Sequence, residues 1–366
     1  MASSFGNSLK VSIFGQSHAK AIGVTIDGFP AGFELDYEEI DRFMERRAPG
    51  RNSFSTARKE PDKPEFITGV LGNVTCGVPI TALIYNKDQH SKDYENLKDV
   101  PRPGHADYTA QIKYKGFQDV SGGGHFSGRM MAPVCIAGGM SLQYLKKHGI
   151  EIAAHISSIG NINDDRIDMA DSVQNELMKV KDKEFPVINN LQGEKMRALI
   201  DEVKGDLDSV GGTIECCIMG LPAGIGAPMF DGIENRIAAA MFGVPAIKGI
   251  EFGNGFETAT LRGSKNNDSF CIKDGTVATK TNNHGGILGG ISSGMPIVFR
   301  VAVKPTPSIA REQDSVRLST MTEEKLEIKG RHDPCIVPRA VPCIEAVAAI
   351  VIMDLLLEER GYGYES

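Results

Sequence analysis

The feature that most limits the fold is a set of segments that occurs twice along the chain. Residues 28–32 (GFPAG) return as residues 220–224 (GLPAG), each after a strand-like run. Residues 69–80 (GVLGNVTCGVPI) align without a gap with residues 286–297 (GILGGISSGMPI). Chance similarity between glycine-rich turns is the alternative, but two matches in the same order favour a duplication.

The repeats predict two related β/α halves, at about residues 1–150 and 200–366. We expect each half to contain sheet strands with helices packed on one face. Strand, turn and helix signals do not alternate as they do in a doubly wound sheet, so that fold is not favoured. Because no low-complexity linker separates the halves, we expect a single domain over residues 1–366.

Helix signals follow both copies of the first repeat. Asp36 and Glu39 form a predicted capping box for a helix over residues 36–47, and Asp231 and Glu234 form a second box. The other predicted segments are helices over residues 133–147, 193–204 and 342–358, and a polar surface excursion over residues 160–190.

Charge and cysteine usage narrow the class of protein. The formal net charge is -7, from 40 basic and 47 acidic residues, which lacks the basic footprint of a nucleic-acid-binding protein. No uncharged apolar run of about 18 residues occurs, so we expect no membrane span. The N-terminal residues lack the pattern of a signal peptide. The 7 cysteines include no C-x-x-C pair, which argues against a disulfide scaffold or zinc module and suits a reducing cytoplasm.

Arginines crowd the end of the first predicted helix. Five of them lie between residues 42 and 58, including Arg46, Arg47 and Arg51. Guanidinium groups bind phosphates and carboxylates bidentately, so the cluster indicates an anion site. The alternative is a solvated helix end whose cations complement the helix dipole.

Three histidines lie among Gly and Pro residues that favour rigid loops. They are His18, His105 and His332. Arg102 stands three residues before His105, and Arg331 directly precedes His332. A histidine beside an arginine on a loop suits proton transfer to or from an anion, although for each histidine taken alone a structural role is favoured.

Glycine-rich segments supply further candidates for anion binding. They lie at residues 121–129, 208–212 and 283–294, and the last precedes a Lys-Pro-Thr-Pro-Ser run at 304–308. Backbone amides in such loops can cradle phosphates. Neither a P-loop nor a dinucleotide-binding fingerprint occurs, no spacing supports a catalytic metal, and no G-x-S-x-G elbow supports a serine hydrolase.

Taken together, these segments resemble the chorismate synthase family over essentially the whole chain. The matching segments are GQSHAKAIGVTIDGFPAG, RRAPGRNSFSTARKEPD, RPGHADYTAQIKYKG, SGGGHFSGR, DSVGG, NHGGILGGISSGMPI, KPTPSI and RHDPCIVPRAVPCIEA. They occur in the family's order and at its approximate spacing. One glycine-rich loop would be a weak signal, whereas eight ordered segments are specific.

The resemblance implies an α+β fold, a β-α-β sandwich built from the two related halves. It implies a lyase that converts 5-enolpyruvylshikimate 3-phosphate to chorismate and phosphate by 1,4-anti elimination, the last common step of aromatic amino acid biosynthesis. The family uses reduced FMN (FMNH2) and is typically a cytoplasmic homotetramer. The sequence leaves open whether the chain reduces its own flavin with NADPH, but no reductase domain is visible, which favours an external reductant.

The resemblance also assigns roles to residues. His105 would protonate the departing phosphate, His18 would lie beside the reduced flavin, and Asp333 would relay a proton, with Ser17 and Ser127 completing the catalytic set. The implied substrate contacts are Arg47, Arg51, Arg102, Arg129 and Arg331. The implied FMN contacts are His125, Phe126, Ser127, Pro245, Ala246, Gly289, Lys304, Pro305, Thr306, Pro307, Ser308 and Arg331.

Several positions depart from the family's pattern. Gln16, His125, Phe126 and Met130 replace a Glu, an Arg, a Ser and a Glu, respectively. Ser53 stands where the family often has an arginine, which Arg51 is positioned to replace. The changes around the flavin leave a second hypothesis open, a non-catalytic paralogue that binds flavin and a phosphorylated acid without turnover.

Overall fold

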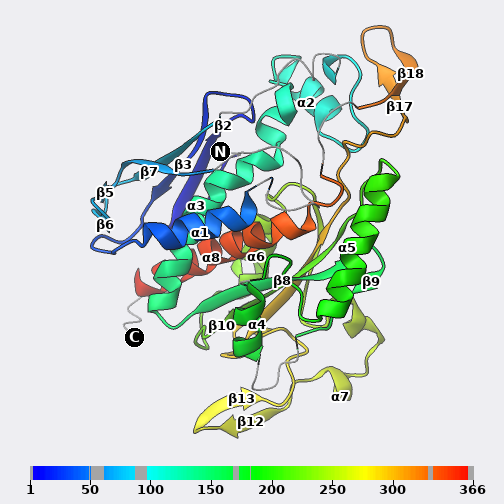
Figure 1. The fold of residues 1–366 in the computed structure, drawn as a ribbon. Coiled ribbons are helices and arrows are strands. Elements are labelled where there is room, and N and C mark those ends of the chain that lie inside the picture. Colours follow the sequence, from blue (N-terminus) through cyan, green and yellow to red (C-terminus); the bar gives the residue numbers. More distant parts are fainter. Residues whose placement is uncertain are drawn as a thin grey trace.

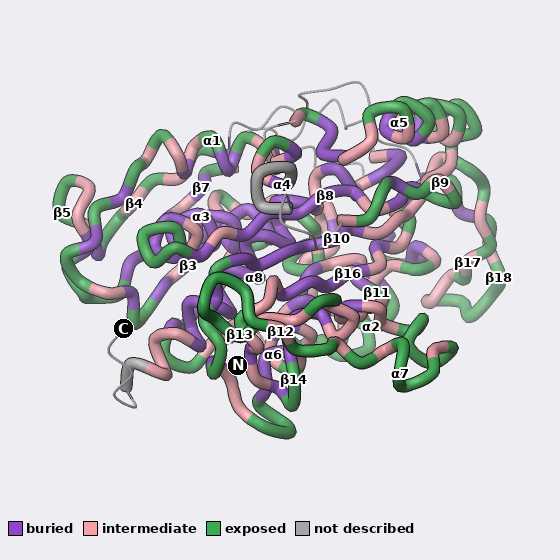
Figure 2. Tube along the Cα trace, turned by 90° about the horizontal axis from the view of Figure 1, so that it is seen from below, coloured by how far each residue is buried: buried purple, intermediate pink, exposed green. Residues whose placement is uncertain are grey.

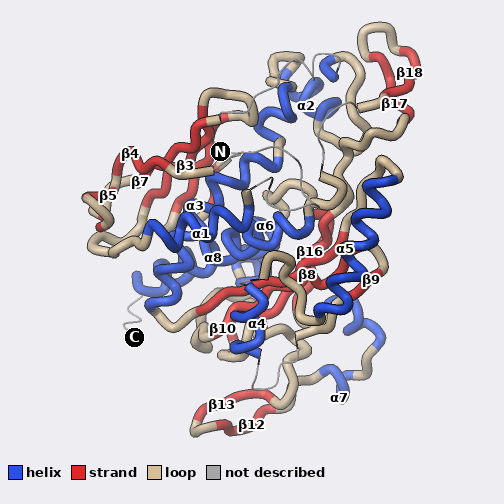
Figure 3. The backbone as a smooth tube through the Cα atoms, in the orientation of Figure 1, coloured by secondary structure: helices blue, strands red, loops and turns tan. Residues whose placement is uncertain are grey.

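Two five-stranded antiparallel sheets enclose a layer of helices in the computed structural model (Figure 1). The structure describes residues 3–48, 50, 62–86, 97–167, 173–181, 183–328 and 333–361. Figure 3 shows the strands of the two sheets on opposite sides of the central helices. This layering confirms the predicted α+β class and β-α-β sandwich.

The first sheet comes from the N-terminal part of the chain. Its order is β1-β2-β3-β7-β4, with the bounds Ser4–Phe5, Lys10–Gly15, Ala21–Asp27, Ile80–Tyr85 and Glu65–Thr68. In β3, the side chains of Ile22, Val24 and Ile26 are buried, and the neighbouring Thr25 and Asp27 are less so. Because successive side chains of a strand point to opposite faces, one face of this sheet packs on the helices.

The second sheet is covered on both faces. Its order is β11-β16-β10-β8-β9, with the bounds Ile247–Phe252, Ile297–Val303, Gly212–Met219, Glu151–Ile159 and Ile162–Asn163. The outer face carries α4 (Val173–Lys181) and α5 (Asn190–Gly205). Leu177 of α4 packs there against Cys217 and Met219 of β10, so this strand is buried on both sides.

Four helices form the layer between the sheets. They are α1 (Tyr37–Arg47), α3 (Met131–Lys147), α6 (Ile233–Met241) and α8 (Val337–Gly361). A Cβ atom built on Gly138 of α3 would lie 2.2 Å from the Cβ of Ala346 in α8, so a glycine is needed where these two helices meet. Figure 2 shows the buried residues concentrated along α3, α8 and the strands that face them.

Helix α8 is long and apolar enough to cross a membrane, by length and composition alone, over Val337–Glu359. In the fold, 83% of its most apolar window is buried inside the protein, as expected of a core helix. Its two buried carboxylates have partners. Glu345 accepts hydrogen bonds from Arg46 at 2.5 and 3.0 Å, and Asp354 accepts from the backbone N–H groups of residues 7–9 at 2.7–3.1 Å.

Smaller elements connect these layers. The short helices are α2 (Asp107–Tyr114), α7 (Gly263–Asn266) and the 3₁₀ helices η2 (Ser121–Phe126), η3 (Gly128–Met130), η4 (Met229–Asp231) and η5 (Gly255–Thr260). The hairpins are β5 (Val70–Leu71) with β6 (Val74–Thr75), β12 (Phe270–Lys273) with β13 (Thr276–Thr279), β14 (Ile287–Leu288) with β15 (Ile291–Ser292), and β17 (Gln313–Arg317) with β18 (Thr322–Leu326).

The two copies of the repeat make the same hydrogen bonds. The hydroxyl of Thr75 donates to the carbonyl of Pro30 at 2.6 Å, and that of Ser292 donates to the carbonyl of Pro222 at 2.6 Å. The glycine that ends each GFPAG or GLPAG run donates its N–H to the carbonyl of the same Thr or Ser, at 2.8 and 2.9 Å. The division into two halves of one domain stays a prediction, which these matching contacts support.

Of the two predicted capping boxes, the first is confirmed only as an N-cap, because the backbone N–H of Asp36 donates to Oε1 of Gln143 at 2.9 Å rather than to Glu39, and the second is wrong. The carboxylate of Asp36 accepts from the backbone N–H of Glu39 at 2.9 Å and caps α1. The cap of α6 is Gly232 rather than Asp231. The carboxylate of Asp231 instead accepts from the guanidinium of Arg236 at 2.7 and 2.8 Å, and this ion pair takes it away from the helix end.

Two further predictions need adjustment. The stretch 160–190 is only partly a surface excursion, because it contains α4 and because Phe185 and Val187 are buried in the main core. The helix expected over 342–358 already begins at Val337, and Pro342 lies inside it. The helices expected over 133–147 and 193–204 are confirmed as α3 and α5.

Candidate functional site

The glycine run of η2 brings two of the predicted histidines to one loop. Gly122, Gly123 and Gly124 have φ values of 59°, 87° and 55°, which side chains other than glycine rarely adopt. A Cβ atom on Gly122 would lie 2.1 Å from Cε1 of His18, and one on Gly123 would lie 3.2 Å from Nε2 of His105. The two imidazoles therefore pack against successive glycines, and the loop accepts both only because it lacks side chains.

The turn that carries His18 is tied to this loop. It follows strand β2, and the backbone N–H of Ser17 donates to the carbonyl of Gly124 at 3.1 Å. Ser17 is only 1% exposed, and its hydroxyl would be 2.8 Å from a Cβ atom on Gly122. The side-chain amide of Asn86 donates to the carbonyl of Ala19 at 2.7 Å and closes the turn from the other side. These contacts fix the backbone on both sides of His18.

His105 belongs to a buried charge cluster at the start of α2. Its Nδ1 lies 2.5 Å from Oδ1 of Asp107, whose carboxylate also accepts from Nε and Nη2 of Arg102 at 2.7 and 2.8 Å. Nη1 of Arg102 donates to the hydroxyl of Ser308 at 3.1 Å. Burial alone would raise the pKa of Asp107, but hydrogen bonds from Arg102 and His105 lower that pKa well below its usual value. Asp107 is therefore a carboxylate at neutral pH.

A second buried cluster joins Arg47 and Arg129 through Asp62. Both guanidinium groups bond to the carboxylate of Asp62, and Arg47 also donates to the carbonyl of Gly128 at 3.1 Å. Burial alone would raise the pKa of Asp62, but the two arginines lower that pKa below its ordinary value. Two cations around one anion leave a net positive charge, which suits the binding of a further anion.

Asp333 connects to the same cluster. Its carboxylate accepts from Nη1 of Arg339 at 2.5 Å, and Nε of Arg339 donates to the carbonyl of Arg47 at 3.2 Å. Burial lowers the pKa of Arg339, and the charge of Asp333 opposes that change. Arg339 thus links Asp333 to the end of α1, where Arg47 of the buried arginine pair lies.

The Lys304 to Ser308 run lies beside the His105 loop. The backbone N–H of Lys304 donates to the carbonyl of Ala246 at 2.9 Å, and its Nζ donates to the carbonyl of Gly104 at 3.0 Å. Burial, with the nearby charge of Lys248, lowers the pKa of Lys304. The hydroxyl oxygen of Thr306 is buried without a hydrogen-bond partner in the described part of the chain, so it is available to a ligand.

Not every residue of the predicted flavin patch joins this group. His125 and Phe126 are exposed, and His125 turns toward the first sheet, with Nδ1 2.8 Å from the carbonyl of Gly15. Gly289 lies in the β14–β15 turn, next to the start of α6. Strand β16 runs from there to Lys304, a length of about 20 Å for 7 residues. Within one chain, Gly289 is therefore apart from Lys304.

Four positions singled out in the sequence lie outside the described residues, namely Arg51, Ser53, Arg331 and His332. The sequence analysis did not assign Asp62 or Asp107, both of which bind the predicted arginines. A signal was present, because each aspartate stands within a matching segment (KEPD and RPGHAD). It was missed because the arginines were read as partners of a ligand rather than of buried carboxylates.

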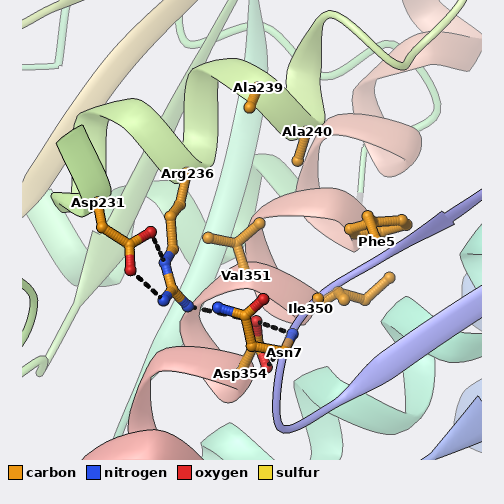
Figure 4. A pocket seen from close by; sticks show the side chains of 10 residues that line it. Phe5, Asn7, Asp231, Arg236, Ala239, Ala240, Ile350, Val351 and Asp354 are labelled. Atoms are coloured by element: carbon orange, nitrogen blue, oxygen red, sulfur yellow. Dashed lines mark hydrogen bonds and ion pairs between the residues drawn. The ribbon is translucent and has the colours of Figure 1, made fainter. Parts of the chain in front are cut away.

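A cavity of about 210 Å³ opens elsewhere, between the N-terminal segment, α6 and α8 (Figure 4). Phe5, Ile350 and Asp354 line it, together with Arg236, whose guanidinium reaches Asp231. None of its lining residues is among those predicted for the site. We place the candidate site at the glycine loop instead, because the titratable groups meet there.

Comparisons with known proteins agree with this geometry. The family model described as "Chorismate synthase" matches residues 9–357. The chain is 48% identical to the chorismate synthase of Lancefieldella parvula, over 99% of each chain, and 45% identical to that of Pyrococcus abyssi, also over 99% of each. A solved structure titled "Crystal Structure of Chorismate Synthase" superposes with a TM-score of 0.78 at 30% identity, covering 98% of this chain and 94% of that one. The chain therefore belongs to the chorismate synthase family.

Proposed function

We propose that the glycine loop, the two histidines and the surrounding cations form the site at which this chorismate synthase acts on 5-enolpyruvylshikimate 3-phosphate. The observation that carries the proposal is the packing of His18 and His105 on successive glycines. Two titratable imidazoles then face one region, with Lys304 and the Arg47–Asp62–Arg129 cluster nearby. The substrate bears a phosphate and two carboxylates, which suits this positive charge in an acidic protein.

Each residue has a proposed task in the elimination. His105 donates a proton from Nε2 to the departing phosphate, as a positioned general acid. Arg47 and Arg129 hold substrate anions, and His18, Ser17 and Ser127 orient groups at the loop. Asp333 relays the proton that leaves the substrate. Arg102 donates to Asp107 through Nε and Nη2 and to Ser308 through Nη1, which favours a supporting role over direct contact with the substrate.

The residues around Lys304 fit reduced FMN. The unpartnered hydroxyl of Thr306 and the ammonium group of Lys304 offer a donor and a positive charge to a phosphate or to an anionic isoalloxazine. Pro305, Pro307 and Ser308 follow Lys304 directly in the chain, and the carbonyl of Ala246 accepts from the backbone N–H of Lys304 at 2.9 Å. Reduced FMN, when bound, supplies electron density to the substrate transiently. The proposed contacts of Gly289, His125 and Phe126 are less well supported, since they lie apart from Lys304 or face solvent.

We further propose a cytoplasmic homotetramer that receives its reduced flavin from an external reductant and binds neither nucleic acid nor membrane. Exposed apolar side chains support the association of copies. They include Phe230 (89% exposed) in η4, Phe256 (86%) in η5, and Phe270 (66%) and Ile272 (73%) in β12. Covering such surface is a common reason for stable assembly.

The alternative of a non-catalytic paralogue is not favoured. The substituted residues His125 and Phe126 are exposed, while Ser17, His105 and Asp107 lie in well-packed, hydrogen-bonded positions. The substitutions at 125 and 126 therefore affect the margin of the site rather than its centre, whereas Met130 is buried in the main core.

An anaerobic assay tests the proposal. Purified protein is mixed with chemically reduced FMN and 5-enolpyruvylshikimate 3-phosphate, and chorismate and phosphate are followed together. We expect equal amounts of both products, and none with oxidised FMN. Binding of flavin and substrate without release of phosphate would support the paralogue instead. The addition of NADPH with oxidised FMN in a separate reaction tests whether the chain needs an external reductant.

A further inference from the structure

Asp107 is the most heavily hydrogen-bonded carboxylate at the site. It is 7% exposed and accepts from the backbone N–H of Arg102 at 3.0 Å, in addition to the two guanidinium contacts and the contact with His105. Its charge is balanced by Arg102, which has no other carboxylate within the distances of an ion pair among the described residues. The carboxylate therefore has a fixed position and a fixed charge.

The contact with His105 decides which ring nitrogen faces the glycine loop. Nδ1 lies 2.5 Å from Oδ1 of Asp107, and a carboxylate can only accept, so the proton between them belongs to Nδ1. Nη2 of Arg102 lies 3.0 Å from Nδ1 and 3.4 Å from Nε2, but the shorter contact of Nδ1 with Oδ1 would set two lone pairs against each other if Nδ1 carried no proton. The opposite nitrogen, Nε2, is the ring atom nearest to a Cβ atom built on Gly123, at 3.2 Å.

We propose that Asp107 is a positioning residue, which keeps the proton on Nδ1 of His105 so that Nε2 alone exchanges a proton with the leaving phosphate. The inference rests on the proposed role of His105. In the step concerned, His105 starts as an imidazolium with a proton on each ring nitrogen. The C–O bond breaks, its electron pair leaves with the phosphate oxygen, Nε2 gives that oxygen its proton, and His105 is left as the neutral Nδ1–H tautomer. Asp107 takes no proton itself, since Arg102 keeps it ionised.

A merely structural role would give a different result. Asp107 also begins α2, where a carboxylate complements the helix dipole, so its loss would lower stability even if it did nothing for His105. The ring tautomer of His105 separates the two roles, because helix stability does not set it. A carboxamide in place of the carboxylate can present its NH2 group to Nδ1, which would then be an acceptor and leave the proton on Nε2.

The test is ¹⁵N NMR of histidine-labelled protein at about pH 8.5, roughly two units above the ordinary histidine pKa. His105 is assigned by comparison with His105→Gln. We expect the Nδ1–H tautomer in the wild type and the Nε2–H tautomer in Asp107→Asn. Anaerobic phosphate release should fall at least about 100-fold in kcat, with KM changed less than about 3-fold, as for loss of the correct tautomer at other acid–base sites. Asp119→Asn is the matched control, since an amide there can still accept from the N–H of Ser121.

The outcomes separate the positioning role of Asp107 from the proposed role of His105 as the general acid. An Nε2–H tautomer in the wild type would overturn the positioning role, and this measurement does not depend on the folding of Asp107→Asn. An unchanged tautomer with unchanged kcat in Asp107→Asn would also overturn it. A switched tautomer with wild-type phosphate release would support the control of the tautomer by Asp107 and contradict the role of His105 as the acid.

Discussion

Two histidines in this protein, the half-buried His105 and the fully buried His155, are surrounded by the same kinds of groups, and only His105 belongs to the candidate site. Nδ1 of His105 contacts Asp107, while Nε2 lies against the glycine loop and has no carboxylate partner among the described residues, with Nη2 of Arg102 at 3.4 Å. His155, in β8, has both nitrogens engaged, with Nδ1 3.1 Å from Asp164 and Nε2 3.1 Å from Glu215. The side chain of His105 is 16% exposed and that of His155 is 0% exposed.

The two histidines differ in whether the surrounding residues leave a ring nitrogen accessible to a ligand. His155 and Glu215 are directly opposite each other on β8 and β10, and Arg300 on β16 and Glu251 on β11 continue the row across the sheet. Every charge in that row is matched by a neighbour, so the row joins four strands and presents nothing to a ligand. At His105 the second neighbour is a glycine, which leaves one ring nitrogen accessible to a ligand. A histidine surrounded by charged groups can thus react with a ligand only where one of its ring nitrogens has no protein carboxylate as its partner.

The largest expected effect tests the reactive histidine. His105→Ala should lower kcat for phosphate release by about 100- to 10,000-fold, the range for loss of a general acid. Binding of oxidised FMN should change only a few-fold, because the proposed flavin contacts centre on Lys304. Stopped-flow phosphate release and fluorescence titration with FMN measure the two quantities. Equal losses in both would contradict the assigned role.

The second prediction concerns the structural histidine. His155→Gln should destabilise the protein by about 3–5 kcal/mol, because it leaves buried carboxylates without their cation. Turnover of the folded variant should stay within about 2-fold of wild type, since the row does not reach the site. Urea unfolding at pH 6 measures the first quantity, and the anaerobic assay measures the second. His148→Gln is the control, since His148 contacts mainly its own helix. A large loss of kcat in folded His155→Gln would break the comparison.

The third prediction tests the glycine that makes room for the other imidazole. Gly122→Ala should lower kcat by about 100-fold, because the new Cβ atom would displace His18 from a position only 2.1 Å away. Gly275→Ala is the matched control, since Gly275 also has positive φ (78°) but no atom within 4 Å of a Cβ. Similar kinetics for both variants would show that backbone strain, and not the displaced imidazole, is responsible.

The smallest expected effect is a pH dependence of stability. Burial alone would lower the pKa of His155, but Asp164 and Glu215 raise that pKa above its ordinary value. A raised pKa stabilises the fold at pH values below about 6.5, and this stabilisation is lost as the pH rises through the folded value. The stability difference between wild type and His155→Gln should therefore shrink from about pH 6.5 upward. Urea unfolding across pH 6–9 measures it, and a difference that grows with pH would refute the charged assignment.

The carboxylates of the same row give stability the opposite pH dependence. Hydrogen bonds from His155 lower the pKa values of Asp164 and Glu215, although burial alone would raise them. Their contribution to stability is present above about pH 4.5 and is lost as the pH falls through the folded values. The row across the second sheet should therefore be most stabilising between these two limits, at mildly acidic pH.

The sequence predicted features that depend on local signals. The cap at Asp36, the helices α3 and α5, and the relation between the two repeats are local or periodic patterns, which a sequence displays directly. The cap at Asp231 failed because a tertiary contact, the ion pair with Arg236, competes with the helix end. The long helix α8 begins earlier than expected because burial between two sheets outweighs the helix-breaking tendency of Pro342.

At the site, residue identity was predictable but the pairing of charges was not. His18, His105 and their glycine-rich loop were all singled out from the sequence. The carboxylates Asp62 and Asp107 were not, because the partner of a buried arginine depends on which loops meet in space. The same limit applies to His155, whose two carboxylate partners lie 9 and 60 residues away along the chain.

The most direct test of the central claim is a crystal structure of the protein with 5-enolpyruvylshikimate 3-phosphate and oxidised FMN. We expect the oxygen that joins the phosphate to the ring to lie within about 3.2 Å of Nε2 of His105, with the substrate against the Gly122–Gly123 loop. Nδ1 should stay on Asp107, and the row around His155 should be unchanged. A phosphate bound away from Nε2, with that nitrogen facing only protein atoms, would contradict the account.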